Sequence, residues 1–535
     1  MTLKTVLLAG AAGFLFVAAP AAAQSDTTRI IDEGMNHSRV MLTASELMDG
    51  IGPRLTNSQN LRRAQDWALG KFRSYGLSNV HLEPFSFGRG WNVTSSSARM
   101  IEPRRVDMVV IPVAWTPGTN GVVRAPIVVA PISKAEHFAA WRGKLAGKIV
   151  LVSLPGTNSD EPKDPAFKRL TDKDIAERDQ FDMPQYDPAA ADRRLKRLKF
   201  ALELDKFLKS EGAVAWVRKS YRDGKLVHGE GYTYLAGQSP TLSGFELAAE
   251  DYRRLARLAK TGPAPVIELA SDAKFDDSTH DANNVIADIP GTDPKAGYVM
   301  AGAHFDSWIA GDGAADNGAG SAVVLEAARI LKSLGVRPKR TIRFALWEGE
   351  EQGLLGSRAY IEQHLVDRPA PAGMDSTTAY MTWGTRFPLV KKPGYSDLKA
   401  YFNMDNGSGK FRGLYAEGNA AAVPLLKEWL APFNSMGASA VVAAKTGGTD
   451  HVYLQAVGLQ GFQFIQDPLD YGSRVHHSSI DTLDHVRGDD LRQAAVVMAG
   501  VLLAAANSDK EIARPPLPTQ PLASDPFAYD DPDKQ

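Results

Sequence analysis

Three segments of the sequence place candidate metal ligands directly after short apolar runs. The first carries His304 and Asp306, the second carries Asp316 among glycines and alanines, and the third carries the adjacent pair Glu350 and Glu351. Two adjacent carboxylates repel each other unless they share a cation or a proton. One member of the pair can therefore bind a metal ion while the other accepts a proton from water activated by that ion.

Each of these segments also has an ordinary explanation, which for Glu350 and Glu351 is a solvated acidic turn. His304 and Asp306 are two residues apart, so in an extended backbone both point to the same side, where one can bind a metal ion and the other can orient it. A packed histidine would explain the first residue equally well. Asp316 precedes a predicted helix that begins near Ser321, where it could be a buried ligand or a helix cap. The glycines around it lack the G-x-G-x-x-G order, which argues against nucleotide binding.

Two later segments complete a set of metal-ligand residue types. Asp405 ends another apolar run, and His476 and His477 form a pair late in the chain. Either segment alone could be structural. As a set, the positions can hold two metal ions that share one carboxylate and keep room for water and substrate, which is the pattern of a catalytic zinc site. In that arrangement the shared carboxylate is Asp316, one ion is held by His304 and Asp405, and the other is held by Glu351 and His477.

The elements that must position these residues are expected to form an α/β sheet. Apolar runs at 284–289, 297–303, 341–347, 400–404 and 461–465 predict strands, and helical spacing lies between several of them. Strands that alternate with helices favour a mostly parallel sheet, in which ligands gather beyond the carboxyl ends of the strands.

A separate block interrupts this pattern. Residues 99–270 are rich in short β-strand patterns, and we interpret them as a β-rich domain inserted into the main one. Within it, residues 157–192 are charged and contain Pro and Asp, which predicts a long surface excursion or lid. The catalytic domain would then comprise residues 24–98 and 271–513, followed by a Pro- and Asp-rich tail over 514–535.

Composition and targeting signals exclude several classes of protein. The formal net charge is −1 at pH 7, which gives no reason to expect a nucleic-acid or membrane-surface partner. The chain has no cysteine, so disulfides, a Cys-based zinc module and a thiol nucleophile are excluded. Residues 1–23 have the basic start, apolar centre and small-residue end of a signal peptide. They predict export to the periplasm or the extracellular space, with no stable membrane insertion after the signal is removed.

Together, the motifs resemble those of the M28 family of zinc metallopeptidases, which includes aminopeptidases and carboxypeptidase Q-like enzymes. The resemblance is carried by residues 301–307, 313–320, 340–357, 404–405 and 477–482, with weaker matches at 52–55 and 87–91. It implies a zinc-exopeptidase fold of the phosphorylase/hydrolase-like type, a mostly parallel mixed sheet flanked by helices. It also implies that the inserted block is a protease-associated domain.

The resemblance implies roles for the matched residues. The zinc ligands, for two Zn²⁺ ions per chain, would be His304, Asp316, Glu351, Asp405 and His477. Glu350 matches the general base, and Asp306 matches the residue that orients His304. His477 is matched rather than His476 because it stands four residues before Asp481, as in the family's pattern. His451 resembles a residue near the substrate.

The expected reaction is hydrolysis of a peptide bond near a chain end, with peptides as substrates. Aminopeptidase activity is the leading expectation, and carboxypeptidase or dipeptidase activity remains open. A glutaminyl cyclase shares this fold and is the alternative enzyme. A non-catalytic binding protein on the same scaffold is the alternative from another class, and it would be expected to lack a ligand or the base. A homodimer is also left open.

Overall fold

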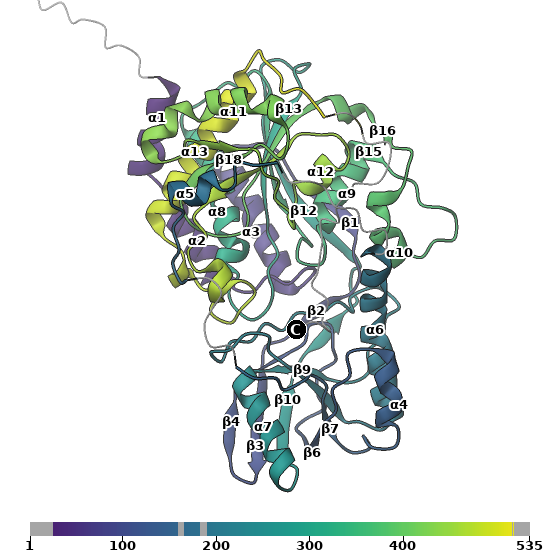
Figure 1. The fold of residues 1–535 in the computed structure, drawn as a ribbon. Helices are drawn as coiled ribbons and strands as arrows, with labels where there is room; N and C mark the ends of the chain where they lie inside the picture. Colours follow the sequence, from purple (N-terminus) through teal and green to yellow (C-terminus); the bar gives the residue numbers. More distant parts are fainter. Residues whose placement is uncertain (1–24, 159–164, 182–189, 516, 518–535) are drawn as a thin grey trace, which may run out of the picture.

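The computed structural model describes residues 25–158, 165–181, 190–515 and 517. They form two bodies, each built on one eight-stranded sheet, which lie one above the other in Figure 1. The expected signal peptide at 1–23 and residues 518–535 of the expected tail lie outside the described residues. Within the described ranges we find no helix that has both the length and the apolar character to span a membrane.

The upper body contains a mixed sheet whose central strands are parallel. In order across the sheet, the strands are β1 (Ser78–Ser86), β12 (Asp281–Ile289), β14 (Thr341–Trp347), β13 (Tyr298–His304), β17 (Leu398–Asn403), β20 (Gly461–Gln466), β18 (Phe411–Tyr415) and β19 (Ala440–Val442). Four of the strand pairings are parallel and three are antiparallel. The antiparallel pairings involve β1, β12 and β18, on either side of the parallel run from β14 to β20. The expected α/β class with a mixed sheet is confirmed.

Helices cover both faces of this sheet because its strands are apolar on both sides. Along β12, Val285 and Ala287 enter one core while Ile286 enters the other, as alternating side chains of a strand must. The larger core holds α1 (Asp26–Asn36), α2 (Val40–Met48), α3 (Gln59–Tyr75), α8 (Ala319–Ser333), α11 (Val423–Leu430) and α13 (Gly488–Asn507). The opposite core holds α9 (Leu355–His364) and α12 (Val452–Gln455), beside a short pair of strands, β15 (Val366–Asp367) and β16 (Val390–Lys391).

The lower body is built on a second sheet that spans Ser96–Ser271. Its strands, in order, are β4 (Val106–Met108), β3 (Ser96–Glu102), β10 (Val266–Ser271), β6 (Val123–Val129), β7 (Ile149–Leu151), β8 (Ala215–Lys219), β9 (Gly244–Leu247) and β5 (Val110–Pro112). Its helices are α4 (Phe138–Trp141), α6 (Ala190–Ser210) and α7 (Ala249–Thr261). The long helix α6 rises beside the sheet and contacts α10 (Ser376–Met381) of the upper body (Figure 1).

The segments that enter and leave the Ser96–Ser271 body lie side by side. Strand β2 (Gly90–Asn92) pairs with β11 (Lys274–Asp276), so that Trp91 lies opposite Phe275. An apolar cluster at this junction includes Trp115 from the lower body and Trp308 from the upper body, whose ring centroids are 6.2 Å apart. At this junction the two bodies therefore share buried apolar contacts as well as the paired strands β2 and β11.

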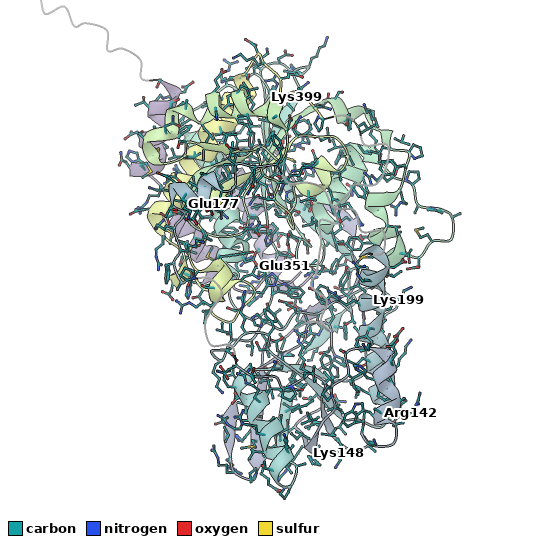
Figure 2. All side chains as sticks on the ribbon, viewed as in Figure 1. Arg142, Lys148, Glu177, Lys199, Glu351 and Lys399 are labelled. Atoms are coloured by element: carbon teal, nitrogen blue, oxygen red, sulfur yellow. The ribbon has the colours of Figure 1, made fainter. Side chains whose placement is uncertain are left out.

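Part of the expected surface excursion lies across the upper body instead of near the second sheet. We call residues 165–181 the strap; it contains α5 (Asp172–Ala176), which lies beside the helices of the upper body in Figure 1. Figure 2 labels Glu177 of the strap on the same body. Lys168 and Leu469 exchange two main-chain hydrogen bonds of 2.8 and 2.9 Å, and Leu170 is buried against the upper body.

Candidate metal centre

The expected ligands lie where the parallel strands of the upper sheet end. His304 is the last residue of β13, Glu351 follows β14, Asp405 follows β17 and His477 follows β20. The carboxyl ends of parallel strands meet at one edge of a sheet, where open α/β folds bind their ligands. Figure 2 shows Glu351 at this edge, near the junction of the two bodies.

Asp316 lies at the centre of the cluster, between the two histidines. Its Oδ1 is 3.1 Å from His304 Nε2, and its Oδ2 is 3.3 Å from His477 Nε2. On the first side, His304 Nε2 is also 3.6 Å from Asp405 Oδ1; on the second, His477 Nε2 is 2.9 Å from Glu351 Oε2. The structure thus brings all five expected ligands together, in two groups that share Asp316.

The chemistry of this cluster fits divalent metal ions. Ligand atoms of His304, Asp316 and Glu351 lie within 4.8 Å of one another, and all three residues are buried. Glu351 Oε1 is buried and receives no hydrogen bond from any described residue. Burial, with added repulsion from Asp316, raises the pKa of Glu351 to about 7 despite the nearby His477. Burial also raises the pKa of Glu350 well above its usual value. Cations among these oxygens would offset the cost of burying them, and a His/carboxylate donor set suits zinc.

Asp306 acts on the centre through two different groups. Its main-chain carbonyl accepts a hydrogen bond from His304 Nδ1 at 3.0 Å, whereas its carboxylate Oδ1 lies 3.8 Å from that nitrogen. The carboxylate instead accepts the main-chain N–H groups of Glu350 and Glu351, each at 3.2 Å, and the Thr56 hydroxyl at 3.0 Å. Asp306 therefore orients the histidine through its main chain, and its side chain holds the turn that carries both glutamates.

Two residues to which the sequence analysis assigned no role anchor the loop around Asp316. Asp481 accepts the main-chain N–H groups of Ala315 at 2.6 Å and of Asp316 at 3.1 Å. Arg54 is fully buried, and its guanidinium donates to the main-chain carbonyls of Phe305, Asp312 and Gly313. Burial lowers the pKa of Arg54 to about 10. Both residues lie inside motifs that carry the resemblance, which is the signal that could have drawn attention to them.

The geometry distinguishes the two neighbouring histidines. His476 Nε2 lies 3.7 Å from Asp316 Oδ2, farther than the 3.3 Å of His477 Nε2. The side chain of His476 is also 34% exposed, compared with 17% for His477. His477 has a φ of 60°, in the left-handed region, which turns its ring towards the cluster at the start of a tight turn.

The structure places His451 away from the cavity beside the cluster. Its side chain is fully buried, with Nε2 3.0 Å from the Thr446 hydroxyl and 3.2 Å from a Glu417 oxygen. The contacts of His451 in the described structure are therefore with protein side chains, and its position near the substrate stays a prediction. The preceding Asp450 is also buried, and its burial raises its pKa to about 7.

A cavity of about 410 Å³ opens beside the metal cluster. It is lined mainly by carboxylates, tyrosines, histidines and small residues, and no Lys or Arg occurs among the lining residues in the described part of the chain. Tyr221, Glu230 and Tyr232 reach it from the lower body, while Glu350 and Tyr471 belong to the upper body. The sequence analysis missed the three residues from the lower body, since nothing in their local pattern relates them to the metal ligands.

Comparisons with known proteins agree with this fold. Residues 284–502 match the model of peptidase family M28. The chain is 28% identical over 474 residues to carboxypeptidase Q of Bos taurus, covering 88% of this chain and 85% of that protein. The crystal structure of a peptidase M28 precursor from Shewanella amazonensis has the same fold, with a TM-score of 0.63, 23% identity and coverage of 92% and 98% of the two chains. BSAP, a zinc aminopeptidase from Bacillus subtilis, gives a TM-score of 0.55, 20% identity and coverage of 91% and 97%.

The fold and the His/carboxylate site define a zinc-dependent metallopeptidase, a hydrolase of peptide bonds. Residues 284–502 match peptidase family M28, and this matched region carries every candidate ligand. The family expected from the motifs is confirmed, and an enzyme is favoured over a non-catalytic binding protein.

Proposed function

We propose that this chain is a di-zinc exopeptidase that removes residues from the amino end of peptides. The observation that carries the proposal is the pair of ligand groups around Asp316, opening onto a cavity that is rich in carboxylates. His304 and Asp405 would complete one zinc site, and Glu351 and His477 the other. Zinc bound there would polarise the scissile carbonyl and make a water molecule a stronger acid and nucleophile.

Glu350 is proposed as the general base of the reaction. It lines the cavity and is only 8% exposed, next to the ligand Glu351. Its main-chain N–H donates to the Asp306 carboxylate, which fixes the turn and so the direction of the side chain. From this position Glu350 would accept a proton from the attacking water and return it to the leaving amine.

The cavity lining supports recognition of a free amino group. A peptide's terminal carboxylate would find no Lys or Arg among the described lining residues, whereas a terminal ammonium group would find carboxylates and tyrosine hydroxyls. This electrostatic match favours aminopeptidase activity over carboxypeptidase activity, although relatives named carboxypeptidase Q are similar over most of the chain.

The direction of cleavage is tested with one peptide series. A free peptide, its N-acetylated form, its C-amidated form and a peptide that begins with Gln are incubated with the zinc-loaded protein, and the products are identified by mass. We expect cleavage of the free and C-amidated peptides and loss of cleavage on acetylation. Cleavage of the free and acetylated peptides but not of the C-amidated one would mean carboxypeptidase activity, and loss of ammonia from the Gln peptide would mean a cyclase. A free dipeptide is added to the series, and cleavage of that dipeptide alone would mean dipeptidase activity.

We also propose the domain organisation and location that the sequence predicts. Residues 99–270 would form an inserted, protease-associated-like domain, a division supported by the separate sheet at Ser96–Ser271. Residues 1–23 would be removed as a signal peptide on export. The mass of the protein recovered from the periplasm or medium tests this, with a mature start near Gln24 expected and an uncleaved chain in the cytoplasm contradicting it.

A further inference from the structure

We propose that Glu230, carried by the lower body, is a positioning residue of the metal centre that fixes the ring of His477. This inference rests on the proposed two-metal site and adds a residue to it from outside the family-matched region 284–502. With Glu230 in this role, the affinity for one of the two ions depends on how the lower body packs against the upper body.

The contact is made by Nδ1 of His477, the ring nitrogen that points away from the metal cluster. Glu230 Oε1 lies 2.8 Å from His477 Nδ1, and the Tyr221 hydroxyl donates to the same oxygen at 2.9 Å. The other ring nitrogen, Nε2, points towards Glu351 and Asp316. A carboxylate that accepts from Nδ1 keeps the proton on that nitrogen, so the lone pair of Nε2 remains available to a metal ion.

The main chain around Glu230 is tightly packed, so the approach of Glu230 to the metal centre is fixed by the fold. Gly229 has a φ of 74°, and its carbonyl accepts the main-chain N–H of Ala114 at 2.8 Å. A Cβ on Gly231 would lie 2.1 Å from the Ala114 carbonyl oxygen, which is impossible without moving the backbone. The two glycines let the segment pass close to Ala114, and this path brings the intervening glutamate to the metal centre.

Further contacts hold the same segment against the turn that carries His477. Arg222 donates to the main-chain carbonyl of His476 at 2.9 Å. The main-chain N–H of Ser479 donates to the carbonyl of Val227 at 3.0 Å. The turn is therefore bound on both sides of His477 by the segment that carries Glu230.

His477 needs this support more than the other histidine ligand does. The Nδ1 of His304 donates to a main-chain carbonyl within its own loop. Among the described residues, Glu230 is the hydrogen-bond acceptor that the structure provides for Nδ1 of His477. Without it, Nδ1 of a ring on a turn, with 17% of its side chain exposed, would lose the hydrogen bond that fixes its tautomer.

The test measures zinc binding directly instead of activity alone. Zinc content and affinity are determined by competition with a chelator for the full chain and for Glu230→Gln, Glu230→Ala and Tyr221→Phe. We expect two ions in the unmodified protein, with one of them bound about 10- to 100-fold more weakly in the Glu230 variants. Glu230→Ala should have the larger effect because it removes the acceptor, and Tyr221→Phe the smallest because it removes only a second donor. Glu136→Gln, at an exposed position in the same body, is the matched control and should bind both ions normally.

A spectroscopic readout separates positioning from general loss of structure. Cobalt is substituted for zinc, and its absorption bands are compared between the unmodified protein and Glu230→Gln, with circular dichroism to confirm folding. We expect the bands of one site to shift while those of the other stay unchanged. Two ions with normal affinity and unchanged bands in both Glu230 variants would overturn the role of Glu230 alone. Fewer than two ions in the unmodified protein would overturn the proposed di-zinc centre itself.

Discussion

The two sides of the metal cluster are supported in different ways. His304 ends a central strand, is 1% exposed, and is oriented by the main-chain carbonyl of a residue two positions away. His477 lies on a turn, is 17% exposed, and is oriented by Glu230, a residue 247 positions away in the other body. Ser321 adds a buried hydrogen bond of 2.9 Å to the carbonyl of His304. The first side is thus formed by folding of the sheet itself, whereas the second is complete only when the two bodies dock.

The metal centre therefore has two halves with different support. We call the side of His304 the rigid half and the side of His477 the conditional half. Local hydrogen bonds form with the strand that carries them, while a contact between bodies depends on the packing of a whole interface. Asp316, the proposed shared ligand, couples the halves, so a substitution is expected to remove zinc from both halves, from one or from neither.

The largest effect is expected from Asp316→Asn, which changes the proposed ligand common to both halves. The amide keeps the size of the side chain and removes the charge that two cations would share. We expect loss of both zinc ions and a fall of peptidase activity to background, measured by metal analysis and turnover on the same sample. Retention of two ions would contradict the shared position of Asp316.

Glu350→Gln should remove turnover while leaving both halves of the centre intact. Because the side chain is proposed to carry protons and not to bind metal, kcat should fall by about 10²- to 10⁴-fold with zinc content unchanged. Glu362→Gln, on helix α9, serves as the control and should keep normal activity. Near-normal kcat in the first variant, or loss of zinc from it, would show that another residue is the base.

Asp306→Asn changes the carboxylate that holds the turn of Glu350 and Glu351, and it can be compared with Glu230→Gln because Glu351 and His477 belong to the same half. The Asp306 carboxylate accepts two main-chain N–H groups and the Thr56 hydroxyl. Its loss should weaken zinc binding and lower kcat by about 10- to 100-fold. We expect both variants to weaken the ion held by Glu351 and His477, as judged from cobalt bands. A shift of the bands of the other site in Asp306→Asn would mean that this side chain also supports the His304 half.

Removal of zinc should destabilise the protein because it leaves buried carboxylates without a counter-charge. With free zinc at about 100 times its Kd, binding stabilises the folded state by about 2.7 kcal/mol. A chelator should therefore lower Tm by roughly 5 °C, as measured by differential scanning calorimetry. Re-addition of zinc should restore the original value, and an unchanged Tm would contradict a buried metal site.

The smallest effect is expected at the strap, whose ion pairs in the described structure are with Asp467 and Asp490 of the upper body and not with a candidate ligand. Arg169 is half exposed and pairs with Asp467 at 3.0 Å and Asp490 at 2.9 Å, both buried. Arg169→Ala should lower the free energy of unfolding by about 1 kcal/mol, while zinc affinity stays within twofold. A large loss of zinc would show that the strap also helps to seat the lower body at His477.

Much of the fold and the ligand set could be predicted because the signals are local. The apolar run at 341–347 coincides with β14, and that at 297–303 differs by one residue from β13. The ligand types follow these runs, so their gathering at one sheet edge follows from parallel pairing. The position of His451 could not be predicted, since spacing does not tell which way a side chain points on a turn, and this one pairs with Glu417.

The sequence by itself determined the strands, the residue types at their ends and the chemistry those types allow, because periodicity and residue type are properties of short segments. Only the tertiary structure decided that the carbonyl of Asp306 orients His304, that residues 165–181 lie on the upper body, and that Glu230 reaches His477. These contacts join segments that are distant along the chain or depend on backbone direction. They are set by how two bodies pack, and no local pattern encodes that packing.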